Sequence, residues 1–378
     1  MIRPFAEPIY VTRPMLPDLE EFVGHLEDVW SSGWLSNGGP KHQRFEEEIR
    51  TLLAVKHATL FNNGTIALIA ALKGLGLRGE VVTTPFTFPA TIHALVWNNI
   101  TPVFCDIDET SLDLDPARIE GSVGPETTGI LAVHVYGTPC DVVSIEQSAR
   151  RHGLRVVYDA AHAFNVKLRG NGIGTFGDVT MFSFHPTKLF HSGEGGALAY
   201  ADDGLRPVYE LLRNFGIKSE EEVVQVGLNG KMNELQAALG LANLAHLESE
   251  SEKRRSVVTT YRNHLSGLGG IRLQEEPADV DPSYQYFVIR VRQEEFGLSR
   301  DDLYQELRRY NVFTRKYFYP LCSEMDCYRN LPSADRANLP VASRAAKEVL
   351  CLPLYGTLGP EAAVRICEMI YEIQRGRA

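Results

Sequence analysis

Short apolar runs alternate with segments of helical apolar spacing along residues 54–200, and this alternation restricts the fold more than any other feature. The run HATLFNN is typical of a strand, and the GTIALIAALKGLGL after it is typical of a helix. Later strand-like runs are EVVTTPF, PVFCDID, GILAVHVYG, RVVYDA, VTMFSF and GALAY, with helical TIHALVWNN and VVSIEQSARRHG between them. Strands that alternate with helices form parallel sheets covered by helices. We therefore predict an α/β fold with a mainly parallel sheet.

The pattern changes after Tyr200, where helical segments dominate. We expect one long helical stretch over 233–266, a strand over 285–291, and helices over 301–310 and 361–376. A chain of 378 residues is long for a single domain. We therefore predict a large domain over residues 1–245 and a smaller C-terminal α+β domain over 246–378.

Composition argues against several classes of protein. The net charge of −10, without a cluster of Lys or Arg, disfavours nucleic-acid binding. We find no apolar run of membrane-spanning length, and the N-terminal MIRPFAEPIY lacks the apolar core of a signal peptide. The six cysteines show no CxxC pair, which is typical of reduced thiols. We expect a cytoplasmic protein that contacts neither membranes nor nucleic acid.

The most informative residues are Asp159, which ends the strand-like VVYD, and Lys188, which follows another such run in a loop rich in Ser and Gly. An aspartate at a strand end and a lysine in such a loop are typical of a pyridoxal phosphate site. The lysine forms the Schiff base, and the aspartate keeps the pyridine nitrogen protonated. Alone, Asp159 would be compatible with a helix cap or a solvated loop acid, and Lys188 with a solvated loop lysine. Their occurrence together favours a cofactor site.

Neighbouring residues fit the same interpretation. Ser183 ends VTMFS at the carboxyl edge of the sheet, where ligands of α/β proteins bind. Gly64 and Thr65 lie between a strand and a helix, which suits either a phosphate-binding helix N-terminus or an ordinary N-cap. His162 would be placed to stack on the ring or to bond to it. Phe88 is equally compatible with a stacking wall and with core packing.

Other nucleotide and metal motifs are rejected. GLGLRG (Gly74 to Gly79) matches GxGxxG, but it follows a helix instead of a strand, so we interpret it as a helix end. Met232 follows Gly230 and Lys231, where a phosphate loop needs Ser or Thr. The histidines show no metal-ligand spacing, so we predict no metal site.

Ordered blocks along nearly the whole chain resemble the DegT-type nucleotide-sugar aminotransferases, within the fold type I superfamily of aspartate aminotransferase. The blocks are WLSNGGPKHQRFEEEI, FNNGTIALIAAL, TTPFTFPAT, PVFCDID, HVYGTPCD, VVYDAAHAF, GDVTMFSFHPTK, GEGGAL, LRNFGI and GLNGKMNELQAALG. The resemblance implies a fold type I transferase with a large cofactor-binding domain and a smaller C-terminal domain.

The resemblance also implies roles for the matching residues. Lys188 matches the Schiff-base lysine, and Asp159 matches the partner of the pyridinium nitrogen. Other cofactor contacts are implied for Gly64, Thr65, Phe88, His162, Ser183 and Asn229. Many members have Gln in place of His162. Asn229 matches an asparagine that reaches the phosphate in the neighbouring subunit, which implies a homodimer with shared active sites.

The implied reaction moves an amino group from L-glutamate to a nucleotide-linked keto-deoxysugar, with pyridoxamine phosphate as the intermediate form of the cofactor. The SFHPTKLFHSGEGG block resembles that of members acting on a dTDP-linked 4-keto-6-deoxyhexose, which favours C4 of dTDP-4-keto-6-deoxyglucose. The implied pathway is biosynthesis of an amino-deoxysugar for a surface polysaccharide (O-antigen or lipopolysaccharide) or a glycosylated metabolite. Relatives that remove a sugar hydroxyl carry histidine at the Lys188 position, so Lys188 favours transamination. We expect substrate contacts from His185, Lys218, Arg315 and Tyr317. The last three are equally compatible with surface charges or a packing ring.

Several alternatives remain open. An aminotransferase for C3 of a dTDP-3-keto-6-deoxyhexose, or one that uses a UDP- or GDP-sugar, would share the same motifs. A non-catalytic regulator that binds pyridoxal phosphate would share the fold, but it would normally carry an added domain. A nicotinamide oxidoreductase would need a strand–GxGxxG–helix unit, which we do not find.

Overall fold

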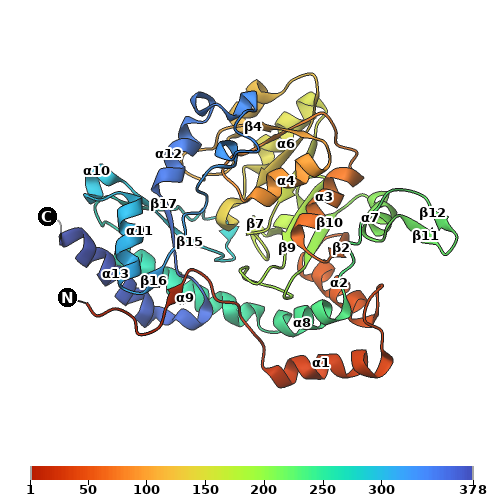
Figure 1. The fold of residues 1–378 in the computed structure, drawn as a ribbon, viewed down its shortest axis with the longest axis horizontal. Helices are drawn as coiled ribbons and strands as arrows, with labels where there is room; N and C mark the ends of the chain where they lie inside the picture. The colour runs from red at the N-terminus through yellow and green to blue at the C-terminus, as the bar shows by residue number, and fades with distance from the viewer. Residues whose placement is uncertain (1, 377–378) are drawn as a thin grey trace.

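The computed structural model describes residues 2–376 and is built around a seven-stranded sheet (Figure 1). Its strands are β2 (His57–Phe61), β3 (Glu80–Thr83), β4 (Thr101–Phe104), β5 (Thr127–Val133), β6 (Arg155–Asp159), β9 (Val179–Ser183) and β10 (Gly196–Tyr200). They lie in the order β2-β10-β9-β6-β5-β3-β4. The pairs within β9-β6-β5-β3-β4 are parallel, and β10 runs antiparallel to β2 and β9. The predicted mainly parallel sheet is confirmed.

Helices cover both faces of this sheet. One face carries α3 (Gly64–Gly74), α4 (Pro89–Trp97) and α7 (Leu205–Arg213), and the other carries α2 (Pro40–Leu52), α5 (Pro116–Ile119), α6 (Val142–His152) and α8 (Glu234–Leu244). Successive strand residues point to opposite faces, so Val81 packs in the core under α3 while Val82 packs under α6. Both layers are needed because the strands are apolar on both sides.

The C-terminal part has a core of its own. A three-stranded antiparallel sheet contains β13 (Ile271–Leu273), β15 (Phe287–Val291) and β17 (Val349–Leu352). It packs with α9 (Leu247–Leu265), α11 (Arg300–Arg309) and α13 (Gly359–Arg375), while α12 (Pro340–Glu348) and Phe318 join a cluster shared with the large sheet. This arrangement is the α+β unit expected for the fold class. The boundary near residue 245 stays a prediction.

The long helical stretch predicted over 233–266 is wrong in one respect, because α8 ends at Leu244 and α9 begins at Leu247. No Gly or Pro marks this break in the sequence. The two helices serve different cores: α8 packs beside α2 under the large sheet, and α9 packs beside α13. A change of packing partner, which local sequence does not encode, therefore separates them.

Several elements lie at the periphery. They are α1 (Leu19–Ser32), α10 (Gln293–Phe296), the hairpin β11 (Ile217–Ser219) and β12 (Glu222–Val223), the pair β1 (Ile9–Tyr10) and β16 (Val312–Phe313), and the small sheet β7 (Lys167–Leu168), β8 (Asn171–Gly172) and β14 (Val280–Asp281). Figure 1 shows the β11–β12 hairpin extending from the body beyond α7. Within residues 2–376, we find no helix long and apolar enough to span a bilayer.

Candidate active site

The carboxyl ends of β6 and β9 bring the two most informative residues together. Asp159 is the last residue of β6 and is paired with Met181 of β9, two residues before Ser183. The loop after β9 then turns back at His185, whose carbonyl accepts a hydrogen bond from the backbone N–H of Lys188 at 2.9 Å. Adjacent parallel strands end at one edge of a sheet, and this is why residues 24 to 29 positions apart share one site.

The N-terminus of α3 faces the same edge. Asn63 caps the helix by accepting a hydrogen bond from the Ile66 N–H at 2.8 Å. A methyl group added at Gly64 would lie only 2.9 Å from Ser183 Cβ and 3.2 Å from its hydroxyl. The glycine therefore allows the helix N-terminus to approach Ser183 closely, which leaves an end with partial positive charge beside two hydroxyls, those of Thr65 and Ser183.

These residues surround a cavity of about 660 Å³. Of the predicted site residues, nine line this cavity: Gly64, Thr65, Phe88, Asp159, His162, Ser183, His185, Lys188 and Tyr317. Tyr286, Phe318 and Glu194 complete much of its wall. The volume is typical of a ligand pocket, and one connected space thus joins a lysine, a carboxylate and a helix N-terminus.

Asp159 is almost fully buried, with 5% of its surface exposed. Burial raises the pKa of its carboxyl, and two hydrogen bonds act in the opposite direction. The Ala161 N–H donates to Oδ1 at 3.0 Å, and the Thr91 hydroxyl donates to Oδ2 at 2.8 Å. Both bonds favour the ionised carboxylate, the form that can pair with a protonated ring nitrogen.

Lys188 lies in an environment that favours its neutral amine. Its residue surface is partly accessible, yet burial of the amine lowers its pKa to about 8, although the charge of Asp159 opposes this shift. A free lysine near pH 7 is almost entirely protonated and is a poor nucleophile or base. An amine with a pKa of about 8 is partly neutral at that pH, so it can act in both roles.

His162 is held as a neutral ring. Burial lowers the pKa of its imidazole well below the ordinary value, and Nδ1 accepts a hydrogen bond from the Tyr136 N–H at 3.3 Å. The ring is parallel to Phe318 at 5.7 Å and meets the edge of Tyr286 at 5.0 Å. These contacts orient His162 toward the cavity and leave its Nε2 to carry the proton.

Three predicted residues do not line this cavity. Lys218 lines a separate hollow beside α7, together with Arg213 and Lys231. The side-chain oxygen of Asn229 accepts a hydrogen bond from Lys231 Nζ at 3.2 Å. Arg315 is exposed, and its backbone pairs with Cys351. The proposed contacts of these three residues with cofactor or substrate stay predictions.

The residues present fit pyridoxal phosphate. The cavity offers an amine of lowered pKa, a carboxylate held by two hydrogen bonds, and an anion-binding helix end that only glycine at position 64 permits. These match the aldehyde, the ring nitrogen and the phosphate of that cofactor. In contrast, we find no group of His, Cys, Asp or Glu among residues 2–376 that could hold a metal ion.

The model of one protein family, described as the DegT/DnrJ/EryC1/StrS aminotransferase family, matches residues 18–371. The chain belongs to this family. The resemblance inferred from the sequence blocks is therefore confirmed, as is the prediction of an aminotransferase. Aminotransferases of this family depend on pyridoxal phosphate.

Two relatives of the DegT/DnrJ/EryC1/StrS aminotransferase family are named dTDP-4-amino-4,6-dideoxy-D-glucose transaminase. The one from Escherichia coli is 44% identical over 96% of this chain and 98% of its own length. The one from Shigella dysenteriae is 41% identical over 97% of this chain and its full length. A crystal structure of DesI, in the presence of its TDP-sugar product, superposes with a TM-score of 0.94 at 36% identity, covering 99% of this chain and 95% of DesI. The predicted fold type I architecture is thereby confirmed.

Sequence reasoning missed Tyr286, Glu194 and Thr91. Tyr286 lies just before β15, more than 120 residues beyond Asp159 in the chain, and its sequence pattern indicates only a strand. Glu194 lies between Gly193 and Gly195, in a loop whose only recognisable local signal is its glycines. Thr91 is a buried hydroxyl in the first turn of α4, a position with no signal except its proximity to Phe88.

Proposed function

We propose that this aminotransferase moves the amino group of L-glutamate to C4 of dTDP-4-keto-6-deoxyglucose. The observation that carries the proposal is that Lys188, an amine with a pKa of about 8, and the carboxylate of Asp159 line the same cavity. The choice of sugar is supported by the names of the two relatives that are 44% and 41% identical to this chain.

In this proposal, the chain's residues hold and move protons around a bound cofactor. Lys188 Nζ would hold the cofactor covalently, and Ser183, Thr65 and the amides of α3 would hold its phosphate. When bound, pyridoxal phosphate supplies a conjugated ring that accepts the electrons left when a donor's α-proton departs. Lys188 Nζ, once free and neutral, would take that proton from the donor's α-carbon and deliver it to C4′ of the cofactor. Asp159 would keep a proton on the ring nitrogen throughout.

We further propose that the enzyme is a homodimer in which Asn229 of each subunit reaches the phosphate site of the other. The exposed apolar side chains of β12 and of the segment just after it support this, because Val223 and Val226 are 68% and 85% exposed in the single chain. Phe88, on the wall of the cavity, is also 57% exposed. A second subunit over these residues would bury them and close the site.

The product would serve a surface polysaccharide, such as O-antigen or lipopolysaccharide, or a glycosylated metabolite, and the enzyme would act in the cytoplasm. The role in polysaccharide or metabolite synthesis rests on the resemblance of the sequence blocks, and the cytoplasmic location is supported by the six cysteines, which are all free.

A substrate panel tests the proposal. Purified enzyme with pyridoxal phosphate and L-glutamate is incubated with dTDP-4-keto-6-deoxyglucose, dTDP-3-keto-6-deoxyglucose, and UDP- and GDP-linked 4-keto sugars. Proton–carbon NMR then locates the new amine. We expect amination at C4 of the dTDP-4-keto sugar, with the others at least about tenfold slower in kcat/KM. A preference for the 3-keto sugar or for another nucleotide would replace the proposed substrate. Absence of amination with all four sugars would favour the alternative of a non-catalytic regulator that binds pyridoxal phosphate.

A further inference from the structure

The side-chain amide of Gln285 bridges the two peptide groups on either side of Lys188. The Leu189 N–H donates to Gln285 Oε1 at 2.6 Å, and Gln285 Nε2 donates to the Thr187 carbonyl at 2.9 Å. Gln285 is 2% exposed. An amide is suited to this position because it offers one donor and one acceptor side by side.

These two hydrogen bonds restrict the backbone of Lys188 from both sides. The N–H of Lys188 itself bonds to the His185 carbonyl at 2.9 Å, so its own peptide group is fixed within the loop. Together, the three bonds hold residues 187–189 in one conformation. The direction in which the Lys188 side chain leaves the backbone, and hence the place of Nζ in the cavity, depends on that conformation.

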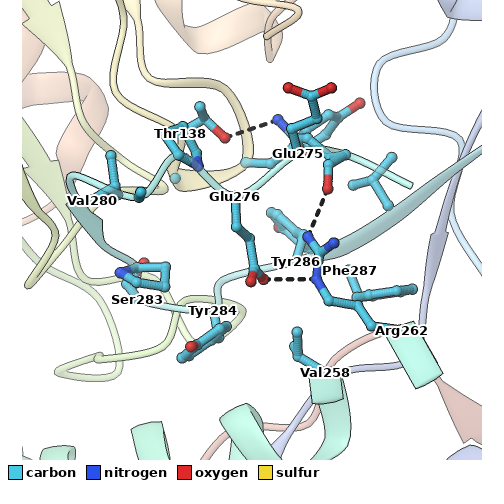
Figure 2. A pocket seen from close by; sticks show the side chains of 17 residues that line it. Thr138, Val258, Arg262, Glu275, Glu276, Val280, Ser283, Tyr284, Tyr286 and Phe287 are labelled. Atoms are coloured by element: carbon cyan, nitrogen blue, oxygen red, sulfur yellow. Dashed lines mark hydrogen bonds and ion pairs between the residues drawn. The ribbon is translucent and has the colours of Figure 1, made fainter. Parts of the chain in front are cut away.

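Gln285 belongs to the segment of residues 274–286, which connects β13 to β15 of the C-terminal core. Between these two strands the segment passes beside the large domain. It is anchored there by β14 pairing with β7 and by the 2.9 Å ion pair between Arg169 and Asp279. Figure 2 shows three residues of this segment around a second pocket: Ser283 and Tyr284 lie on the side away from Arg262, and Tyr286 lies beside Arg262. The chain then enters β15, which is buried.

The same segment also contacts His162. Ser283 Oγ donates to the His162 carbonyl at 3.3 Å, and the Tyr286 ring meets the His162 ring at 5.0 Å. Consecutive residues of one crossing segment therefore touch both His162 and the Lys188 loop.

We propose that Gln285 is a positioning residue, whose amide fixes the Lys188 backbone so that Nζ reaches the cofactor's aldehyde. This inference rests on the proposed function, because it takes Lys188 as the amine that bonds to the cofactor. In that step the Nζ amine adds to the aldehyde carbon and one water leaves, so that a C=N bond replaces C=O. Pyridoxamine phosphate has no aldehyde and cannot take this step.

The two forms of the cofactor therefore give a test that does not depend on turnover. Dissociation constants for pyridoxal phosphate and pyridoxamine phosphate are measured with the cofactor-free full chain, for wild type, Gln285→Leu, Gln285→Glu, Gln274→Leu and Lys188→Ala. Gln274 is the matched control: it lies on the same segment and donates to Thr138 and Ser111, away from Lys188. Gln285→Glu keeps the length of the side chain and an acceptor for the Leu189 N–H.

For Gln285→Leu we expect pyridoxal phosphate to bind about tenfold more weakly, while pyridoxamine phosphate affinity stays within about twofold. The affinity of Gln285→Glu for pyridoxal phosphate should lie between those of Gln285→Leu and wild type. Gln285→Glu replaces the leucine variant in the test if Gln285→Leu does not fold. Gln274→Leu should match wild type. A merely structural role would weaken both cofactor forms equally in the Gln285 variants, and that result would overturn the proposal.

The Lys188→Ala variant distinguishes a failure of the proposed function from a failure of the role of Gln285. We expect it to lose most of the preference for the aldehyde form. If Lys188→Ala keeps that preference, Lys188 is not the bonding amine and the proposed function fails. If Lys188→Ala loses the preference and both Gln285 variants keep it, only the role of Gln285 is wrong.

Discussion

The hydroxyl of Thr91, in the first turn of α4, donates a 2.8 Å hydrogen bond to Oδ2 of Asp159 at the end of β6. Thr91 is fully buried and lies 2.8 Å from the hydroxyl of Thr87, so a short chain of hydroxyl groups ends at the carboxylate. This bond lowers the pKa of Asp159 against the effect of burial, which raises it. Thr91 therefore helps Asp159 to remain ionised inside the protein.

Replacing Thr91 by Val should raise the pKa of Asp159, because it removes a donor that favours the charged form. The acid limb of the kcat profile should move to higher pH, and kcat at neutral pH should fall about tenfold. Thr91→Ser restores the hydroxyl and should restore the wild-type profile. Identical pH profiles for Thr91→Val and wild type would show that the bond has no influence on Asp159.

Lys188 should destabilise the cofactor-free fold. Its pKa is about 8 in the folded chain and 10.5 ordinarily, so the protonated amine is disfavoured by folding. The resulting loss in the free energy of unfolding is complete below pH 8 and disappears as pH rises toward 10.5, because the unfolded chain binds more protons than the folded chain in that interval. Lys188→Met should therefore raise the free energy of unfolding at pH 7 by roughly 1–3 kcal/mol.

Urea unfolding of both cofactor-free proteins at pH 7 and pH ~9.5 checks this sign. The advantage of the methionine variant should shrink at the higher pH. An advantage that grows with pH would mean that the pKa of Lys188 is raised, and not lowered, by folding.

Gly64→Ala should impair phosphate binding. The added methyl would lie 2.9 Å from Ser183 Cβ, so α3 and β9 would have to move away from each other. We expect pyridoxal phosphate affinity to fall about tenfold or more and unfolding stability to fall by about 1–3 kcal/mol. Gly121→Ala, where a methyl meets no atom within 4 Å, is the control and should change neither quantity. Cofactor titration and thermal unfolding of both variants give the comparison.

The β11–β12 hairpin and the segment just after it, which contains Val226, should carry part of a subunit interface. Val226→Asp introduces a charge at a side chain that is 85% exposed in the single chain, so it should leave the monomer fold intact and oppose dimer formation. Sedimentation velocity should report about tenfold or greater weakening of the dimer. Val143 on α6 is also exposed, at 44%, and Val143→Asp should not alter association. Equal behaviour of the two variants would place the interface elsewhere.

The sequence predicted the sheet, several of its helices and the central pair of the site, because each of these depends on local patterns. Asp159 and Lys188 are recognisable from a strand end and a glycine-rich loop, and the structure brings both to the wall of one cavity. The alternation of strands and helices over 54–200 likewise needs only local periodicity, and the seven strands lie where it places them.

The residues that support the site could not be predicted from local sequence patterns. Gln285 and Thr91 lie 97 residues after Lys188 and 68 residues before Asp159, and their sequence neighbours indicate only a strand and a helix. Their contacts arise from the packing of distant elements. The same cause explains the break between α8 and α9, which follows a change of core. Lys218, Arg315 and Asn229 carry suitable chemical groups but lie outside the cavity of the single chain.

The most direct test of the account follows the nitrogen itself. Wild type and Lys188→Ala, each loaded with pyridoxal phosphate, are incubated with ¹⁵N-labelled L-glutamate and dTDP-4-keto-6-deoxyglucose, and the sugar is analysed by NMR. We expect ¹⁵N bonded to C4 of the sugar with the wild type and no labelled sugar with Lys188→Ala, although the variant still binds the cofactor. Labelled sugar formed by Lys188→Ala at the wild-type rate, or unlabelled sugar with both proteins, would contradict it.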